Sequence, residues 1–536
     1  MKKPLKFIEN VTIQVHKKSQ SLVLNHALLP FVSDLKHKVI EDGGKSYVAV
    51  KHDLDSYKKL KDCGLDVPHP FDTLYNPPKL SGIYDPMPHQ LQSAKFLVDN
   101  KRSFNLSEPQ TGKTYSLLMG YDFLHKFCGV RKVIIYSTLS GVESTWHQTV
   151  LDTFSDYSVG VLPNGNTRGI LETFAKDLDI YITNHDTVKN KDFLKALRQR
   201  KDIDIILWDE HDVISNASTD MTKCFKNSIQ LHQRVLLASG TPTGSKPTAA
   251  WSPVRIISPD NVPQYFGKFR DLVQYKVGEF TWVNRKNANE IVHKAMQPAI
   301  CFLKKDVLTK MPELRHERIE CKLSAEQKKM YESMRKTMLM EHESGDKILA
   351  VNAADRVIKL LQITLGAYKI GENEYQEIDC QDRIEKIIEC LKTTPRKAIV
   401  FCPFRGAMTL YHREIRKHFS CSMVSGDTSS KERNIIFDNF KNAENPHVLI
   451  AHPATTSHSL SFYIADKILW VGPAQKSLNF LQANERIASA SQEHPMTIFF
   501  IGATPLEWKR FDSLIAKRDD QTALLQLYQE VLKDGA

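Results

Sequence analysis

Four consecutive residues, Thr111-Gly112-Lys113-Thr114, carry the groups that a phosphate-binding loop needs. They follow a short apolar run and precede a helix-like stretch, so the order is strand, loop and helix. Loop amides and a helix N-terminus attract phosphate, Lys113 supplies a mobile positive charge, and the Thr114 hydroxyl can hold Mg²⁺. Ser107 begins the loop with a small residue other than glycine, and Gln110 stands where glycine is common. The alternative interpretation is a polar helix N-terminus capped by threonine.

An acidic pair, Asp209-Glu210, directly follows the apolar run 203–208. Acidic residues just beyond the carboxyl end of a buried parallel strand lie where an α/β sheet binds its ligand. Asp209 can hold Mg²⁺ through water, and Glu210 can polarise an attacking water. A lone pair of this kind is more often a solvated acidic turn, but together with the phosphate loop it favours a nucleotide site.

Other polar residues are candidates for the same site. Gln90 precedes the phosphate loop and can read an adenine edge by paired hydrogen bonds. Residues 239–242 follow a third apolar run, where small and hydroxylated side chains either sense the phosphate or simply end the strand. Gln482 and Arg486 open a polar stretch far along the chain, from which an arginine can reach a γ-phosphate. Taken alone, that arginine would be interpreted as a surface residue.

The elements that would position these residues alternate along two parts of the chain. Near-continuous apolar runs separated by helical patterns are typical of parallel strands buried on both faces. The first set of runs is 132–136, 179–182, 203–208 and 235–238, and the second set is 397–401, 447–451, 467–471 and 496–501. The sequence therefore predicts an α/β fold with two parallel sheets in tandem.

The remaining stretches predict a division into four parts. Residues 1–80 predict a small α+β unit, with strands near 11–15 and 46–50, and a proline-dense connector that stops helices. Residues 81–255 would form the first sheet domain, 256–375 a mainly helical linker or protrusion, and 376–536 the second sheet domain with C-terminal helices. Within the linker, residues 324–327 have the pattern of a capping box that opens a long helix.

Composition limits the class of protein. Lys plus Arg is 73 and Asp plus Glu is 62 over 536 residues, which gives a formal net charge of +11. This balance permits a polyanion partner without requiring one. The nine cysteines form no CxxC pair and no zinc-ligand spacing, so we expect reduced thiols. No apolar h-region follows Met1 and no run reaches ~18 apolar residues, so we expect neither secretion nor a membrane span.

The order of these motifs resembles that of the superfamily 2 helicases, and within them the Swi/Snf-type DNA translocases. The resemblance runs over residues 85–520. Besides the motifs above, the matching segments are 134–140 with Trp146, 183–185, 250–253, 266–269, 303–307, 323–331, 400–404, 425–429 and 482–492. The N-terminal arrangement, with 48–50 and 65–68 before the motor, is similar to phage-encoded members of this group.

The resemblance implies two RecA-like domains in tandem with ATP and Mg²⁺ between them, a helical insertion, and a small N-terminal α+β domain. The implied catalytic residues are Lys113, Glu210 and Arg486, with Thr114 and Asp209 holding the metal. The implied nucleotide contacts are Gln90, Ser107, Gln110, Thr111, Gly112, Lys113, Thr114, Asp209, Gln482 and Arg486. The implied nucleic-acid contacts are Ser137, Thr138, Asn184, Phe404 and Thr428.

The function that this resemblance implies is that of an ATP-dependent DNA helicase or translocase, a DNA-stimulated ATPase. It would move on duplex, forked or branched DNA with little sequence preference, in replication, recombination or repair. We expect it in the cytoplasm, which is the host's cytoplasm for a phage-encoded member. The N-terminal domain would bind duplex DNA or dock replication or recombination proteins.

Three positions depart from the family pattern. Gln110 replaces the usual glycine, residues 458–461 replace a glycine-rich segment, and Ser489 stands where motif VI has its second arginine. That arginine contributes ~10³-fold or more in rate. Either Arg486 acts alone, another basic residue substitutes, or hydrolysis is slow. Two alternatives follow: a nucleic-acid-binding protein on a helicase scaffold with weak or no ATP hydrolysis, and an RNA helicase.

Overall fold

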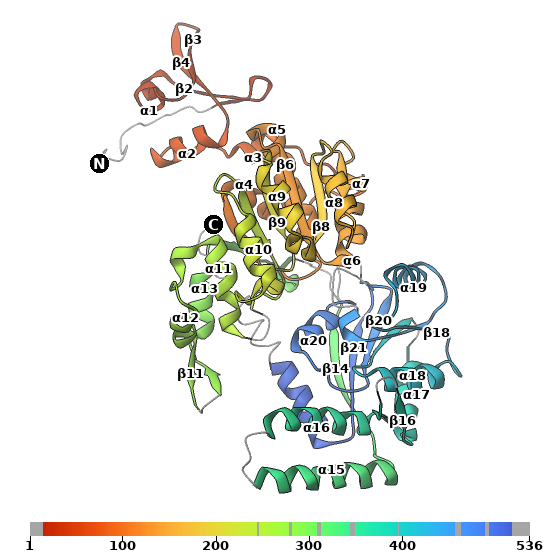
Figure 1. Ribbon diagram of the computed structural model, residues 1–536. Helices are drawn as coiled ribbons and strands as arrows, with labels where there is room; N and C mark the ends of the chain where they lie inside the picture. The colour runs from red at the N-terminus through yellow and green to blue at the C-terminus, as the bar shows by residue number, and fades with distance from the viewer. Residues whose placement is uncertain are drawn as a thin grey trace.

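The fold consists of two parallel-sheet domains, a small N-terminal sheet, and helices that cover and connect them (Figure 1). The computed structural model describes residues 14–243, 246–277, 281–307, 312–343, 349–371, 374–394, 396–455, 462–487 and 492–516. No helix in these ranges combines the length and apolar character needed to cross a membrane.

The first domain is built on a seven-stranded sheet in which every neighbouring pair is parallel. In sheet order the strands are β13 (Ala299–Ile300), β5 (Arg102–Asn105), β10 (Arg234–Ala238), β9 (Ile203–Trp208), β6 (Lys132–Ser137), β8 (Ile180–Asn184) and β7 (Val159–Val161). The apolar runs at 132–136, 179–182, 203–208 and 235–238 are confirmed as buried strands. The fold class predicted from the sequence, two RecA-like parallel-sheet domains in tandem, is confirmed.

Helices cover both faces of this sheet, and each face has its own apolar core. One face packs against α4 (Pro88–Asp99), α5 (Lys113–Cys128) and α7 (Gln148–Thr153). The other packs against α8 (Thr167–Phe174), α9 (Lys191–Gln199), α10 (Asp220–Ser228) and α11 (Trp251–Ile257). Shorter segments are α6 (Leu139–Gly141), the π-helix η3 (Val142–His147), η4 (His185–Lys189) and η5 (His211–Ile214).

The second domain is built on a six-stranded parallel sheet. In sheet order the strands are β14 (Leu314–Glu320), β21 (Met496–Gly502), β20 (Ala465–Trp470), β17 (Lys397–Phe401), β19 (Val448–Ala451) and β18 (Cys421–Val424). Its helices are α17 (Gln381–Lys392), α18 (Arg405–Ile415), α19 (Ser430–Asn442) and α20 (Ser477–Asn484). The four apolar runs predicted for this sheet are confirmed.

The segment between the sheets differs from the predicted helical linker. Its first part, α12 (Phe266–Val273), the hairpin β11 (Gln274–Lys276) and β12 (Trp282–Asn284), and α13 (Ala288–Ala295), leads into β13 on the first sheet. Its second part begins with β14 on the second sheet. Each of the two sheets thus takes one edge strand from this segment.

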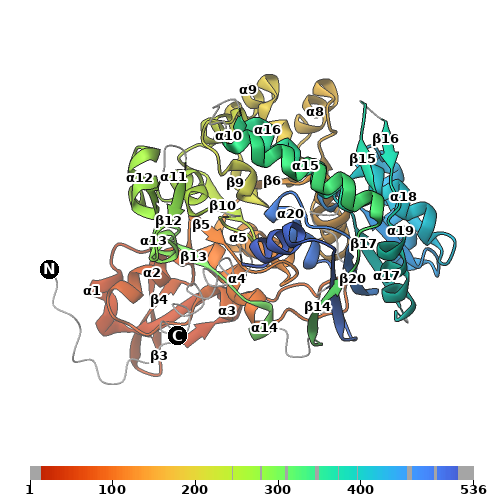
Figure 2. The same cartoon turned by 90° about the horizontal axis from the view of Figure 1, so that it is seen from below.

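Two long helices, α15 (Ala325–Glu343) and α16 (Leu349–Thr364), project from the second domain (Figures 1 and 2). The predicted capping box at the start of α15 is confirmed. Gln327 N donates to Ser324 Oγ at 3.2 Å, and Ser324 N donates to Gln327 Oε1 at 3.0 Å. The hairpin β15 (Ala367–Lys369) and β16 (Tyr375–Glu377) follows.

The N-terminal unit is an antiparallel sheet of β1 (Gln14–His16), β2 (Ser21–Asn25), β4 (Lys45–Lys51) and β3 (His37–Asp42), followed by α2 (Leu54–Asp62). The predicted strand at 46–50 is confirmed. The predicted strand at 11–15 is described only from residue 14 onward. The proline-dense connector after it contains one short helix, α3 (Pro70–Leu74).

Candidate nucleotide-binding site

The phosphate loop joins β5 to α5 through two residues in left-handed backbone conformation. Gln110 has φ +66° and Gly112 has φ +82°. Glycine suits 112, because φ +82° strains other residues and an added Cβ would lie 2.1 Å from Gln90 Nε2. Gln110 has no such freedom, and a non-glycine residue held there costs about 1–2 kcal/mol. The sequence predicts that Gln110 restricts the conformation of the loop. In the structure the backbone of Gln110 is strained.

Lys113, the first residue of α5, is held inside the loop. Its Nζ donates to Ser107 O at 2.8 Å and to Glu108 O at 3.1 Å. Burial lowers the pKa of Lys113, and the nearby carboxylates of Glu210 and Asp209 oppose that shift. Carbonyl oxygens are weaker partners for an ammonium group than phosphate oxygens, so the loop offers a positive charge that an incoming phosphate can attract.

Gln90 contacts the phosphate loop and the start of its own helix. Its Oε1 accepts from Met87 N at 2.9 Å, and its Nε2 lies 3.5 Å from Thr111 O, which His89 Nε2 also contacts at 2.8 Å. The amide predicted to read adenine therefore faces the start of its own helix and the loop. Of the predicted nucleotide contacts, Gln90, Ser107, Thr111 and Gln482 are buried and do not line the cavity described below.

Asp209 follows β9 and is fixed by two donors from the neighbouring β6 and η3. Ser137 Oγ donates to Asp209 Oδ2 at 3.2 Å, and Trp146 Nε1 donates to the same oxygen at 3.0 Å. Both donors are almost fully buried. The hydroxyl of Ser137, a predicted nucleic-acid contact, points inward to this carboxylate in the structure. His185, whose Nε2 lies 2.8 Å from Asp209 O, braces the backbone of the same residue.

Glu210 lies next to Asp209 in an unusual electrostatic setting. Its backbone is left-handed, with φ +52°. Burial, followed by repulsion from Asp209, raises the pKa of Glu210 to about 7, while Lys113 and Arg486 pull it down. Ser239 Oγ donates to Glu210 Oε2 at 3.3 Å and accepts from Thr241 N at 3.0 Å. A carboxyl group that titrates near neutral pH is suited to exchange a proton with water.

Arg486 brings the second domain to this cluster. It follows α20 of the second domain. Burial lowers the pKa of Arg486 to about 10, and Glu210 and Glu485 oppose the shift. The neighbouring Gln482 is 3% exposed, and within the described part of the chain neither of its amide atoms has a hydrogen-bond partner. Buried polar atoms without partners are typical of ligand sites.

A cavity of about 290 Å³ joins these groups. It brings together most of the predicted catalytic and nucleotide-binding residues and several residues that the sequence did not indicate. The lining residues are Leu80, Pro109, Gln110, Gly112, Lys113, Thr114, Tyr115, Thr145, Thr149, Asp209, Glu210 and Arg486. Leu80, Tyr115, Thr145 and Thr149 belong to no motif, and no sequence signal identified them.

Three contacts connect the phosphate loop to the segment that carries Arg486. Gln110 Nε2 donates to Glu485 O at 2.9 Å. The Glu485 carboxylate pairs with Lys304 Nζ, and Lys304 N donates to Glu108 Oε2 at 2.6 Å. Lys304 is 4% exposed and the Glu485 side chain is 33% exposed, so their ion pair is partly buried. No pattern in the sequence indicates these contacts.

The other predicted nucleic-acid residues differ in their surroundings. Thr138 caps α6 by accepting from Gly141 N at 3.2 Å, and Asn184 Nδ2 donates to Asn164 Oδ1 at 3.1 Å. Phe404, a predicted nucleic-acid contact, is 6% exposed and packs in the core of the second domain. Thr428 is half-buried, and its Oγ1 accepts from Ser425 N at 3.0 Å. Ser489 and residues 458–461 lie outside the described residues.

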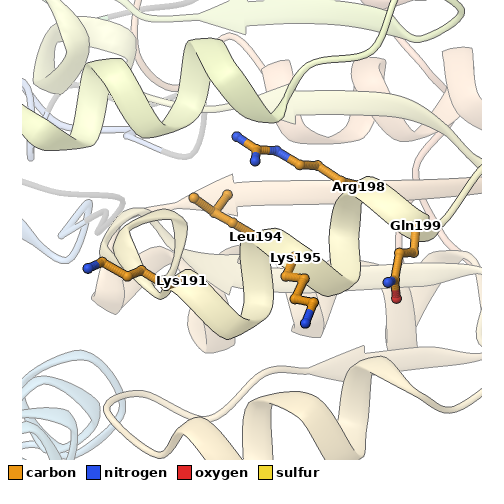
Figure 3. A pocket seen from close by; sticks show the side chains of 5 residues that line it. All are labelled: Lys191, Leu194, Lys195, Arg198 and Gln199. Carbon is orange, nitrogen blue, oxygen red and sulfur yellow. The ribbon is translucent and has the colours of Figure 1, made fainter.

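A hollow of about 350 Å³ on α9 has a strongly basic lining (Figure 3). Its residues are Lys191, Leu194, Lys195, Arg198 and Gln199. The three cationic residues are exposed, and in the ranges that the structure describes none of them is paired with a carboxylate. We call these three residues the α9 basic groove.

Comparisons with known proteins agree with this architecture. The profile of the SNF2-related domain matches residues 31–370, and that of the helicase conserved C-terminal domain matches residues 382–490. A SWI/SNF-related matrix-associated actin-dependent regulator of chromatin subfamily A-like protein 1 from Xenopus laevis is 22% identical over 305 residues, which cover 56% of this chain and 30% of that protein. Transcription regulatory protein SNF2 of Saccharomyces cerevisiae is 20% identical over 422 residues, covering 72% of this chain and 24% of that protein.

The chain thus spans less than a third of the length of these curated relatives. Among solved structures, the Sulfolobus solfataricus SWI2/SNF2 ATPase core in complex with dsDNA matches with a TM-score of 0.39 and 17% identity, over 85% of this chain and 96% of that one. The SNF2-related profile covers more than half of the chain. This protein therefore belongs to the SNF2-related family and has the two-part, helicase-like core of that family.

Proposed function

We propose that this protein is an ATP-dependent DNA translocase or helicase. The observation that carries the proposal is the meeting of Lys113 and Glu210 of the first sheet with Arg486 of the second in one cavity. A site divided between two domains changes when they move apart. Hydrolysis can therefore be coupled to a hinge motion that steps the pair along DNA.

The residues present suit nucleotide hydrolysis. Lys113 would neutralise charge on the transferred phosphoryl group, Arg486 would stabilise the charge that develops in the transition state, and Glu210 would accept a proton from water. Thr114 and Asp209 both line the cavity and offer a hydroxyl and a carboxylate, which are oxygen ligands of the kind Mg²⁺ prefers. Bound there, Mg²⁺ would supply further positive charge against the phosphates.

The nucleic-acid surface would include Thr138 and the α9 basic groove. Unpaired surface cations attract the phosphate backbone, give salt-dependent affinity and read little sequence. This supports duplex, forked or branched DNA as the partner. We further propose roles in replication, recombination or repair, docking of partner proteins or DNA on the N-terminal sheet, and phage origin. The nine free cysteines support a reducing compartment, which we take to be the cytoplasm.

ATP turnover tests the proposal. Turnover is measured alone, with duplex DNA, with forked DNA and with RNA, for the wild type and for Lys113→Ala. We expect DNA to raise the rate at least about tenfold, and Lys113→Ala to abolish turnover because it removes the ammonium group that the loop holds through Ser107 O and Glu108 O. If DNA does not stimulate turnover and Lys113→Ala does not reduce it, the turnover does not come from this site. That result would contradict the enzymatic role and favour a binding protein. Stronger stimulation by RNA would identify an RNA helicase.

A further inference from the structure

Glu485 is the point where two separate contacts from the first domain meet. One contact is the amide of Gln110, which reaches the Glu485 carbonyl oxygen at 2.9 Å. The other is Lys304, whose ammonium group pairs with the Glu485 carboxylate. Both come from the immediate surroundings of the phosphate loop, and Glu485 directly precedes Arg486.

The Lys304 contact is anchored on the phosphate loop itself. Residues 299–304 run beside β5 and the loop: Ala299 and Ile300 pair with Phe104 and Asn105, and Glu108 N donates to Phe302 O at 3.0 Å. The last link is the bond from Lys304 N to Glu108 Oε2 at 2.6 Å. Lys304 therefore links Glu108 of the phosphate loop directly to Glu485 of the second domain.

The Gln110 contact explains a residue that looks unfavourable by itself. Its left-handed backbone would suit glycine, and glycine would have no side chain to reach the second domain. The amide instead spans the boundary between the domains and holds a carbonyl oxygen next to Arg486. Arg486 N donates to Ala483 O at 3.2 Å, and Arg486 O accepts from Phe462 N at 2.8 Å. Together with the Gln110 bond to Glu485 O, these bonds hold the backbone around Arg486 at three points.

We propose that Gln110, with the ion pair of Lys304 and Glu485, is a positioning device that seats Arg486 in the cavity when the domains are closed. The role of the device in catalysis rests on the proposed ATP hydrolysis. Arg486 has a long side chain that can adopt many rotamers. Because its backbone is already fixed, less conformational entropy is lost when the side chain binds a phosphate. Gln110 is thus a positioning residue that acts through Arg486.

A double-mutant cycle tests this inference with two readouts. Gln110→Ala leaves a non-glycine residue in the left-handed backbone conformation and removes the hydrogen bond from Gln110 Nε2 to Glu485 O. We expect kcat to fall about tenfold to fiftyfold while KM for ATP changes less than about threefold, because the lost contact acts through a transition-state group. In an Arg486→Ala background, Gln110→Ala should cause less than about a twofold further loss, because the two residues act as a unit.

The second readout does not need hydrolysis. Amide hydrogen exchange of residues 480–487, measured without nucleotide, should quicken at least about threefold in Gln110→Ala. It should stay at the wild-type rate in the control Gln264→Ala, an exposed glutamine remote from the cavity. Faster exchange in a protein that hydrolyses no ATP would uphold the positioning contact and overturn only the proposed function. Additive kinetic losses together with unchanged exchange would overturn the inference.

Discussion

Ser239 Oγ donates to Glu210 Oε2 at 3.3 Å, so the segment after β10 is linked directly to the carboxylate that follows β9. Burial and the charge of Asp209 raise the pKa of Glu210 to about 7, and the Ser239 hydrogen bond lowers it. The protonation of Glu210 therefore depends on the length and position of this contact.

The first prediction concerns the pH dependence of turnover. If Glu210 accepts a proton from water, kcat falls as pH drops below about 7, because the protonated carboxyl cannot act as a base. Ser239→Ala removes a donor to the ionised form, so the pKa rises and the acidic limb of the kcat profile moves to higher pH. The exposed Ser218→Ala should leave the limb in place. A limb that is unchanged or moves to lower pH in Ser239→Ala would contradict this role for Ser239.

The second prediction concerns stability. The pKa of Glu210 is raised in the folded state from an ordinary value of 4.5, so its stabilising contribution is complete below pH 4.5 and is lost as pH rises toward 7. Glu210→Gln has a similar shape without the buried charge. We expect its Tm to exceed that of the wild type by roughly 3 °C or more at pH 8, with the difference shrinking toward pH 4.5.

The same variant should lose at least about 100-fold in turnover, because an amide cannot accept the proton. Thermal unfolding across the pH series and kcat at pH 8 are the two measurements. A Tm difference that is constant with pH would show that Glu210 is not the titrating group.

The third prediction concerns the phosphate loop. Gly112→Ala should weaken nucleotide binding at least about tenfold and lower Tm, because a Cβ would lie 2.1 Å from Gln90 Nε2 in left-handed backbone. Gly112→Ala with Gln90→Ala relieves the collision but keeps the backbone strain, so we expect partial recovery. Binding of a fluorescent ATP analogue measures the effect. Gly267→Ala has open space around its added methyl group and serves as the control. Wild-type binding by Gly112→Ala would contradict the loop geometry.

The fourth prediction concerns the α9 basic groove. Replacing Lys191, Lys195 and Arg198 by alanine should weaken DNA binding about equally for unrelated sequences. If all three contact phosphates, the slope of log K against log salt becomes less steep by about 0.9 for each lost contact. The control replaces Lys386 and Lys417, which already pair with Glu389 and Glu414. An unchanged slope would show that the α9 basic groove does not contact DNA phosphates.

Much of the fold and part of the site could be predicted from the sequence because the signals are local. A buried parallel strand is a continuous apolar run, and the loop from Thr111 to Thr114 lies within a few residues of the strand and helix that position it. β13 was missed because it has two residues, too few for a pattern. The edge strand β14 was missed for a different reason, since at the rim of its sheet it is mostly exposed and lacks an apolar run.

The parts that could not be predicted depend on which surfaces meet. Gln110 and Glu485 are 375 residues apart, and neither residue type indicates the other. Ser137 follows the pattern of a motif that binds nucleic acid, but its hydroxyl faces Asp209 because the end of β6 lies next to the end of β9. Side-chain direction at a strand end is decided by the neighbouring strand, which the local sequence does not specify.

We propose that Arg486 from the second domain completes a nucleotide-hydrolysis site built on the first domain. DNA-stimulated ATP turnover by Arg486→Ala, measured at saturating duplex DNA beside the wild type, tests this proposal. We predict a loss of about 10³-fold in kcat with KM for ATP changed less than about fivefold, since the arginine acts on transition-state charge. Turnover by Arg486→Ala at the wild-type rate would contradict the account.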